Sequence, residues 1–305
     1  MSSGIKGICP IISTPFTETG EVDYDSMRNL LHTLMAGGCH ALTLFGIAGE
    51  YYKLNDEESK NLVEIVVEEC RRGNVPSIIS VTDHSTKLAV DKARYLQDAG
   101  ADSLMLLPPF FLKPGAAALR DHIRQVAQAV SIPVIVQYAP EQTGVGIDPA
   151  VFQELSNEFP HLDYKIECKP PGAYISRLLA GVERPVNIYV GNAGYQMLEN
   201  FDRGAVGVMP GCSMFDIYLK VYHHYMNGNR QEAVHIHNIL ISILNHIRQN
   251  VEMIIYYEKQ ILYKRGIIES GHCRIPSFTP DKIYDALFEE YYEQTKPYFD
   301  EIKVS

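Results

Sequence analysis

Short apolar runs rich in β-branched residues recur along the chain, and each precedes a segment whose apolar positions repeat with a helical period. The eight runs are IKGICPIIST (5–14), HALTLFG (40–46), PSIISVT (76–82), DSLMLLPP (102–109), PVIVQYA (133–139), LDYKIEC (162–168), PVNIYVGN (185–192) and AVGVMPG (205–211). Strand and helix alternate about every 30 residues, which favours parallel pairing through right-handed crossovers. The predicted fold class is α/β, a (β/α)8 TIM barrel with a C-terminal helical extension.

Residues that begin or end helices stand between these runs at suitable places. Asn55 with Glu58 three residues later forms a capping-box pattern, and Ser85 precedes the helical segment TKLAVDKARYLQDAG. Gly37 and Gly100 stand where helices should end. The segments between the runs are therefore predicted to be helices.

The pattern becomes helical throughout after Phe215, with a weak break at NGN (227–229) and a loop at 270–280. We expect residues 1–220 to form the barrel, and residues 221–305 to pack on it as helices without an independent core. An open doubly wound sheet is the structural alternative. The turn after the first run, STPFTETGEVD, lacks the glycine-rich dinucleotide fingerprint of that fold.

Composition narrows the classes of partner. At 305 residues and 46% hydrophobic content, the chain can bury the core of one α/β barrel, which takes roughly 250 residues. The formal net charge is -10, from 37 acidic and 27 basic residues without a block of like charge. A polyanion is not the predicted partner, so we expect no nucleic-acid binding.

Targeting signals and metal motifs are absent from the sequence. No apolar stretch reaches the roughly 18 residues of a membrane span, and MSSGIKG lacks the basic and apolar regions of a signal peptide. We expect a cytoplasmic protein with no membrane partner. No zinc or other metal site is predicted, because the cysteines are far apart and read as reduced, mostly buried thiols: Cys9, Cys39, Cys70, Cys168, Cys212 and Cys273.

One lysine interrupts the sixth run. Lys165 lies at the C-terminal end of the sixth strand, where barrel side chains point into the reaction site. Burial favours its neutral amine, which can attack a ketone. Glu167 falls on the same face by strand alternation. A structural Lys165–Glu167 ion pair is the alternative interpretation, although the same alternation also places a carboxylate beside an imine.

The second run ends in FGIAGEYYKLNDEE, whose GxxGE pattern predicts a tight turn. The amides of Ile47, Ala48 and Gly49 in this turn could hold an anion such as a carboxylate. A simple loop between strand and helix is the alternative, because GxxGE is common.

Histidines and tail aromatics have simpler interpretations. His84, in VTDHST at the end of the third run, is the best placed to touch a substrate. The aromatic tail EEYYEQTKPYF predicts a docking helix or a subunit contact. Packing or surface roles are expected for the histidines within helical segments: His122, His235, His237 and His246.

Taken together, the motifs resemble one family. GICPIISTPFTETGEVD, FGIAGEYYKLNDEE, GADSLMLLPPFFLKP, IPVIVQYAPEQTG, YKIE, YVGNAG and GAVGVMPG occur in the order, spacing and strand positions of the dihydrodipicolinate synthase / N-acetylneuraminate lyase family. The resemblance covers roughly residues 5 to 225. It implies a Schiff base between Lys165 and the keto carbon of pyruvate or another 2-keto acid, whose carboxylate would sit on the amides of Ile47 and Ala48. Met209 would line the same site.

The resemblance implies no cofactor, and it implies a homo-oligomer, a tetramer or a dimer. Departures from the family pattern remove its hydroxyl groups. Gln137 occupies the position of the proton-relay tyrosine, and Tyr138 should turn away from the barrel interior. Ile47 and Ala48 replace the usual threonines, and Phe111 aligns with a second tyrosine lent by a neighbouring subunit.

Gln142 stands where dihydrodipicolinate synthases carry a substrate-binding arginine. This substitution argues against lysine-pathway synthesis, and the missing relay tyrosine argues against cleavage of sialic acid.

Four functions remain open. The favoured one is dehydration of a 2-keto-3-deoxy sugar acid, with Lys165 and Glu167 as catalytic residues and Gln137 among those that bind substrate. The alternative is a pyruvate-dependent class I aldolase, including a dihydrodipicolinate synthase-like or N-acetylneuraminate lyase-like activity. A keto-acid-binding pseudoenzyme is the third. An unrelated phosphate-binding barrel, resting on GNAG and PGCS, is ranked last because it leaves Lys165 without a purpose.

Overall fold

The computed structural model describes residues 4–301, which form two compact units. The first unit comprises residues 4–9 and Pro76–Met209, and the second comprises Pro10–Val75 and residues 210–301. The predicted division at residue 220 stays a prediction.

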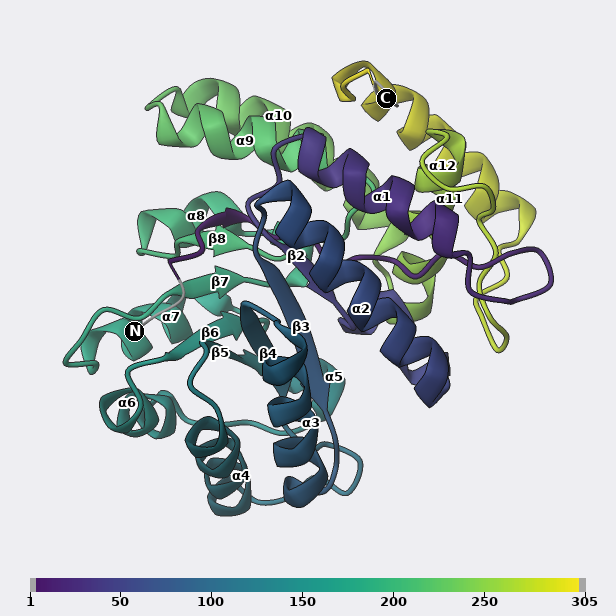
Figure 1. Cartoon of the computed structure of the whole chain (residues 1–305). Helices are drawn as coiled ribbons and strands as arrows, with labels where there is room; N and C mark the ends of the chain where they lie inside the picture. Colours follow the sequence, from purple (N-terminus) through teal and green to yellow (C-terminus); the bar gives the residue numbers. More distant parts are fainter. Residues whose placement is uncertain (1–3, 302–305) are drawn as a thin grey trace. The chain divides into compact units, whose positions relative to one another are not determined.

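Seven parallel strands form the first unit's sheet (Figure 1). Every neighbouring pair is parallel and in register along the whole series. Each strand lies inside one of the predicted apolar runs. Their order across the sheet is β1 (Gly7–Ile8), β8 (Gly207–Val208), β7 (Ile188–Val190), β6 (Leu162–Ile166), β5 (Val134–Tyr138), β4 (Ser103–Leu107) and β3 (Ser77–Thr82).

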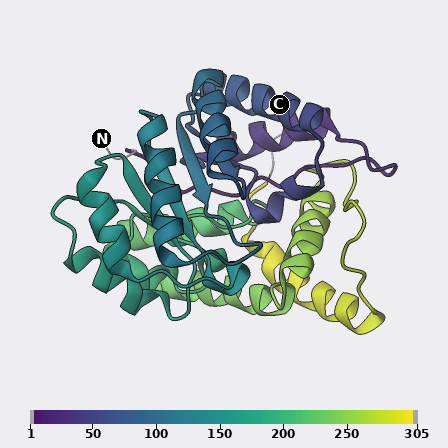
Figure 2. The same cartoon turned by 90° about the horizontal axis from the view of Figure 1, so that it is seen from below.

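Helices connect these strands and contact one another in chain order. The contacts run from α3 to α4, from α4 to α6, from α6 to α7 and from α7 to α8. Figure 2 draws these helices in colours from blue to green. This is the crossover arrangement that parallel strands require. The helical elements are α3 (Thr86–Ala99), α4 (Ala116–Ala129), α5 (Pro140–Thr143), α6 (Pro149–Glu158), α7 (Pro171–Ala180), η3 (Asn192–Gly194) and α8 (Met197–Asp202).

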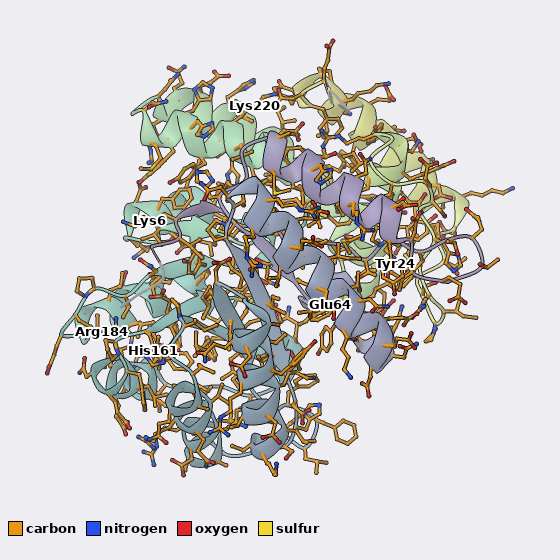
Figure 3. The ribbon with its side chains drawn as sticks, in the orientation of Figure 1. Lys6, Tyr24, Glu64, His161, Arg184 and Lys220 are labelled. Carbon is orange, nitrogen blue, oxygen red and sulfur yellow. The ribbon has the colours of Figure 1, made fainter. Side chains whose placement is uncertain are left out.

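The N-terminal end of β6 is fixed by Arg184, which is labelled in Figure 3 near His161. Its guanidinium donates to the carbonyls of Ser156 at 2.7 Å, Phe159 at 2.8 Å and Leu162 at 2.9 Å. Reaction sites of such barrels form at the C-terminal ends of the strands. Because Arg184 donates to carbonyls at the N-terminal end of β6, its role is to stabilise the fold.

The second unit contains strand β2 (Leu42–Leu44) and a set of helices. Ile11 bridges in parallel to Thr43 on one side and to Gly211 on the other. Helix α1 packs on α2, and α10 packs on α9 and α12. The elements are α1 (Tyr24–Ala36), η1 (Ile47–Gly49), η2 (Tyr51–Lys53), α2 (Asp56–Gly73), α9 (Phe215–Met226), α10 (Arg230–Ile247), α11 (Val251–Lys264), α12 (Lys282–Thr295) and η4 (Lys296–Tyr298).

Helix boundaries follow the predicted capping residues. Asn55 and Glu58 form a complete capping box at the start of α2, and Ser85 caps α3. Gly100 ends α3 in the left-handed conformation, with φ of 99°, and Gly37 is the C-cap of α1. The predicted breaks at 227–229 and 270–280 separate α9 from α10 and α11 from α12. These predictions are confirmed.

Two further findings concern the whole described chain. All six cysteines are buried thiols outside disulfides, as predicted. Over residues 4–301, no helix combines the length and the apolar character that a transmembrane segment needs.

His122 on α4 makes the stability of the first unit depend on pH. Its side chain is 2% exposed, and burial lowers its pKa from 6.5 to about 4. Its Nδ1 lies 3.0 Å from the Thr86 hydroxyl. Between pH 6.5 and pH 4, His122 binds a proton in the unfolded chain but not in the folded one. The folded state therefore keeps its full stability above pH 6.5 and loses stability as pH falls toward 4.

We expect the free energy of unfolding to fall by about 2 kcal/mol between pH 7.5 and pH 5 because of His122 alone. Urea unfolding of the wild type and of His122→Gln checks this, because glutamine keeps a polar partner for Thr86 without titrating. The exposed His223, changed to Gln, serves as the control. An equal loss in the wild type and in His122→Gln would assign the pH dependence to other groups.

Candidate active site

Lys165 and Gln137 lie opposite each other on neighbouring strands. They are paired in the β5–β6 register, so both side chains project from the same face of the sheet. Lys165 is 4% exposed and Gln137 is 3% exposed. Two polar side chains that are this deeply buried need partners, because an unpaired charge or amide is costly in the interior.

Glu167 supplies the partner for both side chains. Its Oε1 lies 3.1 Å from the Lys165 Nζ, and its Oε2 accepts a hydrogen bond of 2.5 Å from the Gln137 Nε2. The backbone N–H of Asn192 donates to Oε1 at 3.3 Å, and the Asn192 side chain donates to the Glu167 carbonyl at 2.7 Å. The carboxylate is thereby held between three donors.

These donors set the ionisation of Glu167. Burial alone would raise its pKa, but the Lys165 ammonium outweighs that effect together with hydrogen bonds from Gln137 and Asn192. The pKa of Glu167 is consequently lowered from its ordinary value of 4.5. Glu167 is an anion at neutral pH and forms the ion pair that the sequence offered as the structural alternative.

Gly191 leaves the space that Glu167 occupies. A Cβ built on Gly191 would stand 1.9 Å from the Glu167 Cγ. The next residue, Asn192, has φ of 52°. The sequence analysis did not assign these two residues to the lysine site, although GNAG directly after the seventh strand was the available signal.

Tyr138 faces away from Lys165 and Gln137, as strand alternation predicted. Its ring stacks on Tyr174 of α7 at 4.5 Å between centroids and meets Phe152 of α6 edge-on at 5.8 Å. It lines a separate pocket of about 410 Å³ with Tyr174 and Cys168. Tyr138 is therefore not in position to replace the relay tyrosine beside Lys165.

Among the other predicted residues of the first unit, Met209 is buried, whereas Phe111 and His84 are exposed. Met209 is 2% exposed, and its N–H donates to the Val190 carbonyl at 3.0 Å, which continues the β7–β8 pairing. Phe111 is 77% exposed, and His84 is also exposed, with its ring 4.9 Å from that of Phe110. His84 therefore contacts this aromatic loop.

The GxxGE turn belongs to the second unit. Ile47, Ala48 and Gly49 form the 3-10 turn η1, and the Gly49 N–H is bonded to the Gly46 carbonyl. Within the part of the chain that the structure describes, the N–H groups of Ile47 and Ala48 have no acceptor. Two adjacent free donors are suited to an anion, so the turn can act as the predicted nest.

Packing fixes the backbone of this turn. The Thr14 hydroxyl donates to the Gly49 carbonyl at 2.6 Å, and a Cβ on Gly49 would stand 2.7 Å from the Ile12 carbonyl oxygen. Phe45 and Glu50, on either side of the turn, both adopt left-handed φ, of 62° and 57°. Such non-glycine residues are held only where surrounding contacts overdetermine them.

Metal ligands do not gather in the described residues. From residue 4 to residue 301, no group of three or more His, Cys, Asp or Glu side chains is close enough to hold a metal ion.

Comparison with known proteins gives the family. Residues 4–292 match the Dihydrodipicolinate synthetase family. A 4-hydroxy-tetrahydrodipicolinate synthase of Campylobacter jejuni is 28% identical over 299 residues, 96% of this chain and 97% of that protein. The synthase of that name from Methanococcus aeolicus is 25% identical over 242 residues, 79% of this chain and 82% of the relative.

Solved structures give the fold. The dihydrodipicolinate synthase of Rhodopseudomonas palustris matches with a TM-score of 0.89 and 24% identity, covering 96% of this chain and 99% of its own. YagE, a prophage protein from E. coli K12 solved in complex with pyruvate, matches with a TM-score of 0.87 and 22% identity, covering 96% and 99%. The α/β TIM-barrel fold with C-terminal helices is thus confirmed.

Proposed function

Because the chain belongs to the dihydrodipicolinate synthetase family, we propose that it removes water from a 2-keto-3-deoxy sugar acid through an imine on Lys165. Membership makes the chain an enzyme of the lyase class. The observation that carries the proposal is the buried cluster of Lys165, Glu167 and Gln137, in which a carboxylate replaces the missing tyrosine hydroxyl beside the amine.

The first step is formation of the imine. Glu167 Oε1, 3.1 Å from the Lys165 Nζ, accepts a proton from the ammonium and leaves a neutral amine. The amine attacks the C2 carbonyl of the keto acid, and the resulting carbinolamine loses its oxygen as water to give the protonated imine. Glu167 returns its proton to that departing oxygen, which restores the carboxylate.

The second step uses the same carboxylate as a base. The iminium withdraws electrons from C3, so Glu167 can remove a C3 proton and produce the enamine. The enamine electrons then expel the C4 hydroxyl, which takes the proton from Glu167 and leaves as water. Hydrolysis of the remaining imine releases a product that has lost one molecule of water and regenerates Lys165.

Binding of the substrate carboxylate is a separate part of the proposal. We assign it to the free N–H groups of Ile47 and Ala48, which attract an anion without needing the threonine hydroxyls of related sequences. Gln137 has a positioning role, because its amide orients the Glu167 carboxylate. Met209 is proposed to line the site through its side chain.

The aldolase alternative uses the same imine. Glu167 would then remove the C4 hydroxyl proton while the C3–C4 bond breaks, releasing pyruvate after hydrolysis. Curated relatives named 4-hydroxy-tetrahydrodipicolinate synthase support a carbon–carbon bond reaction. Gln142 at the position of their substrate-binding arginine, and Gln137 at the position of the tyrosine, support the dehydratase.

Product analysis with a panel of 2-keto-3-deoxy sugar acids tests the proposal. We expect a keto product that has lost water, with no pyruvate released. Pyruvate as the product would overturn dehydration in favour of cleavage. Borohydride trapping of pyruvate on Lys165 without turnover of any sugar acid would instead indicate a keto-acid-binding protein, and the absence of trapping would overturn the imine itself.

A further inference from the structure

The second unit contains a lysine that is completely buried. Lys259, on α11, is 0% exposed. Its Nζ forms an ion pair with the Oε1 of Glu50, the glutamate of the GxxGE turn, and donates to the His272 carbonyl at 3.0 Å. It also lies over the ring of Phe16, 4.1 Å from the centroid. A side chain without solvent access reaches no ligand directly, so its effect must pass through these contacts.

Lys259 acts through Glu50, its ion-pair partner. Glu50 is 0% exposed and links η1 to η2 as the C-cap of the first turn and the N-cap of the second. Lys53 Nζ binds its other carboxylate oxygen, Oε2, at 2.9 Å. The side chain of Glu50 is therefore anchored at both oxygens while its backbone occupies the left-handed region at φ of 57°.

Anchoring Glu50 also fixes the turn that carries the two free N–H groups. The N–H of Glu50 donates to the Ile47 carbonyl at 3.3 Å, which closes the turn that contains Ile47 and Ala48. Left-handed backbone at a non-glycine residue is strained and persists only when neighbours impose it. Lys259 and Lys53 are neighbours that impose it here.

Stability alone is a weak reason for this arrangement. Burial lowers the pKa of Lys259, against the opposing effect of Glu50, so the charged form pays for desolvation before the pair forms. Buried ion pairs are often no more stabilising than apolar residues of similar volume. What the pair does provide is a fixed direction for one carboxylate.

We propose that Lys259 is a positioning residue that holds Glu50, and through it the Ile47–Ala48 turn, in the conformation that binds the carboxylate of the keto acid. The inference rests on the proposed function, because it assigns Lys259 to affinity for that substrate. Lys259 contributes to the half-saturating concentration and not to the chemistry at Lys165.

The test compares Lys259→Met with the wild type in borohydride trapping over a range of pyruvate concentrations, with labelling of Lys165 measured by mass spectrometry. We expect the half-saturating pyruvate concentration to rise about tenfold or more, while the labelling reached at saturation stays unchanged. The double variant Lys259→Met with Glu50→Gln removes the buried carboxylate together with its cation, and Lys53 keeps Glu252 at 3.9 Å as an ion-pair partner. It is expected to fold and to show the same rise.

Asp216→Asn is the matched control. Asp216 pairs with Arg265 in the same unit, at 2.6 Å and with both side chains nearly as buried. The other hydrogen bonds of this pair go to Ser213, Ile217 and Asp300. This variant should lose stability and keep the half-saturating concentration. The inference is wrong if the folded Lys259 variants keep the wild-type half-saturating pyruvate concentration, or if Asp216→Asn raises that concentration equally.

Backbone hydrogen exchange over residues 45–54 separates this inference from the proposed function. Exchange there should become faster in the Lys259 variants and stay unchanged in Asp216→Asn, whether or not pyruvate is trapped. A wild type that fails to trap pyruvate overturns the proposed function, and with it the assignment of the turn to a keto acid. Unchanged exchange in the Lys259 variants overturns the inference even where trapping succeeds.

Discussion

Replacing Lys165 by alanine is expected to reduce turnover at least about 10⁴-fold, because no other amine can take over the covalent step. Borohydride labelling with pyruvate should disappear in the same variant. The change also leaves Glu167 without its cation, so burial would then act against ionisation of the carboxylate with less opposition. Raising the pH would ionise this carboxylate again but would not replace the missing amine, so residual activity should not recover.

Lys169→Ala provides the control for this variant. Lys169 stands four residues further along, exposed at the surface and paired with Glu141 at 2.8 Å. Both variants remove one lysine from the same segment, but only one removes a buried amine. Full turnover in Lys165→Ala, or loss of labelling in Lys169→Ala with retention in Lys165→Ala, would contradict the assignment of the nucleophile.

The strands could be predicted because burial on both faces leaves a strong sequence signal. PVIVQYA and LDYKIEC each became a strand that is buried along its whole length. Apolar content and β-branching are local properties, so no knowledge of the partner strands was needed. The division into compact units was not foreseen, because it depends on contacts between segments far apart in the sequence.

Part of the site could be predicted from the alternation of side chains along a strand. Alternation placed Glu167 on the face of Lys165 and turned Tyr138 away, and both expectations match the observed contacts. Asn192 was missed because it acts through a backbone N–H in a left-handed turn, which side-chain chemistry does not reveal. Gly191 was missed because its contribution is the absence of a Cβ.

Lys259 was missed for a different reason. The segment 251–264 has a helical pattern, which predicts a C-terminal helix but does not show where its charged positions point. Glu258 and Lys259 are both buried, on a helix whose other buried residues are aliphatic or aromatic. Adjacent opposite charges within an apolar helical run are the signal that could have directed attention to this helix.

In the proposed reaction, Glu167 takes the part that a tyrosine hydroxyl has in the family pattern. A tyrosine at position 137 would be neutral and would have to lose its own proton before it could accept another. Glu167 is already ionised and forms an ion pair with Lys165. Gln137 cannot exchange a proton, but its amide fixes one carboxylate oxygen and leaves the other beside Lys165. The loss of the hydroxyl at 137 and the presence of the carboxylate at 167 are thus two parts of one arrangement.

Replacing Glu167 by glutamine is expected to slow imine formation, in which Glu167 carries protons to and from Lys165, and to block the steps that follow it. The substitution keeps the shape of the side chain and an oxygen for the Gln137 amide, but the new amide cannot accept a proton. We expect borohydride labelling of Lys165 with pyruvate to persist at high concentration. Turnover, and exchange of the pyruvate C3 protons with deuterated water, should fall about 10²- to 10⁴-fold, the usual effect of removing a general base.

Proton NMR of pyruvate in deuterated water measures this exchange directly. Because the pKa of Glu167 is lowered from 4.5, the carboxylate stays ionised through the neutral range, and its contribution should be lost only as pH falls through that lowered value. Glu141→Gln, which changes the partly exposed carboxylate paired with Lys169, is the control and should leave the exchange rate intact. Exchange at the wild-type rate in Glu167→Gln would move the role of base to another group while leaving the imine on Lys165 in place.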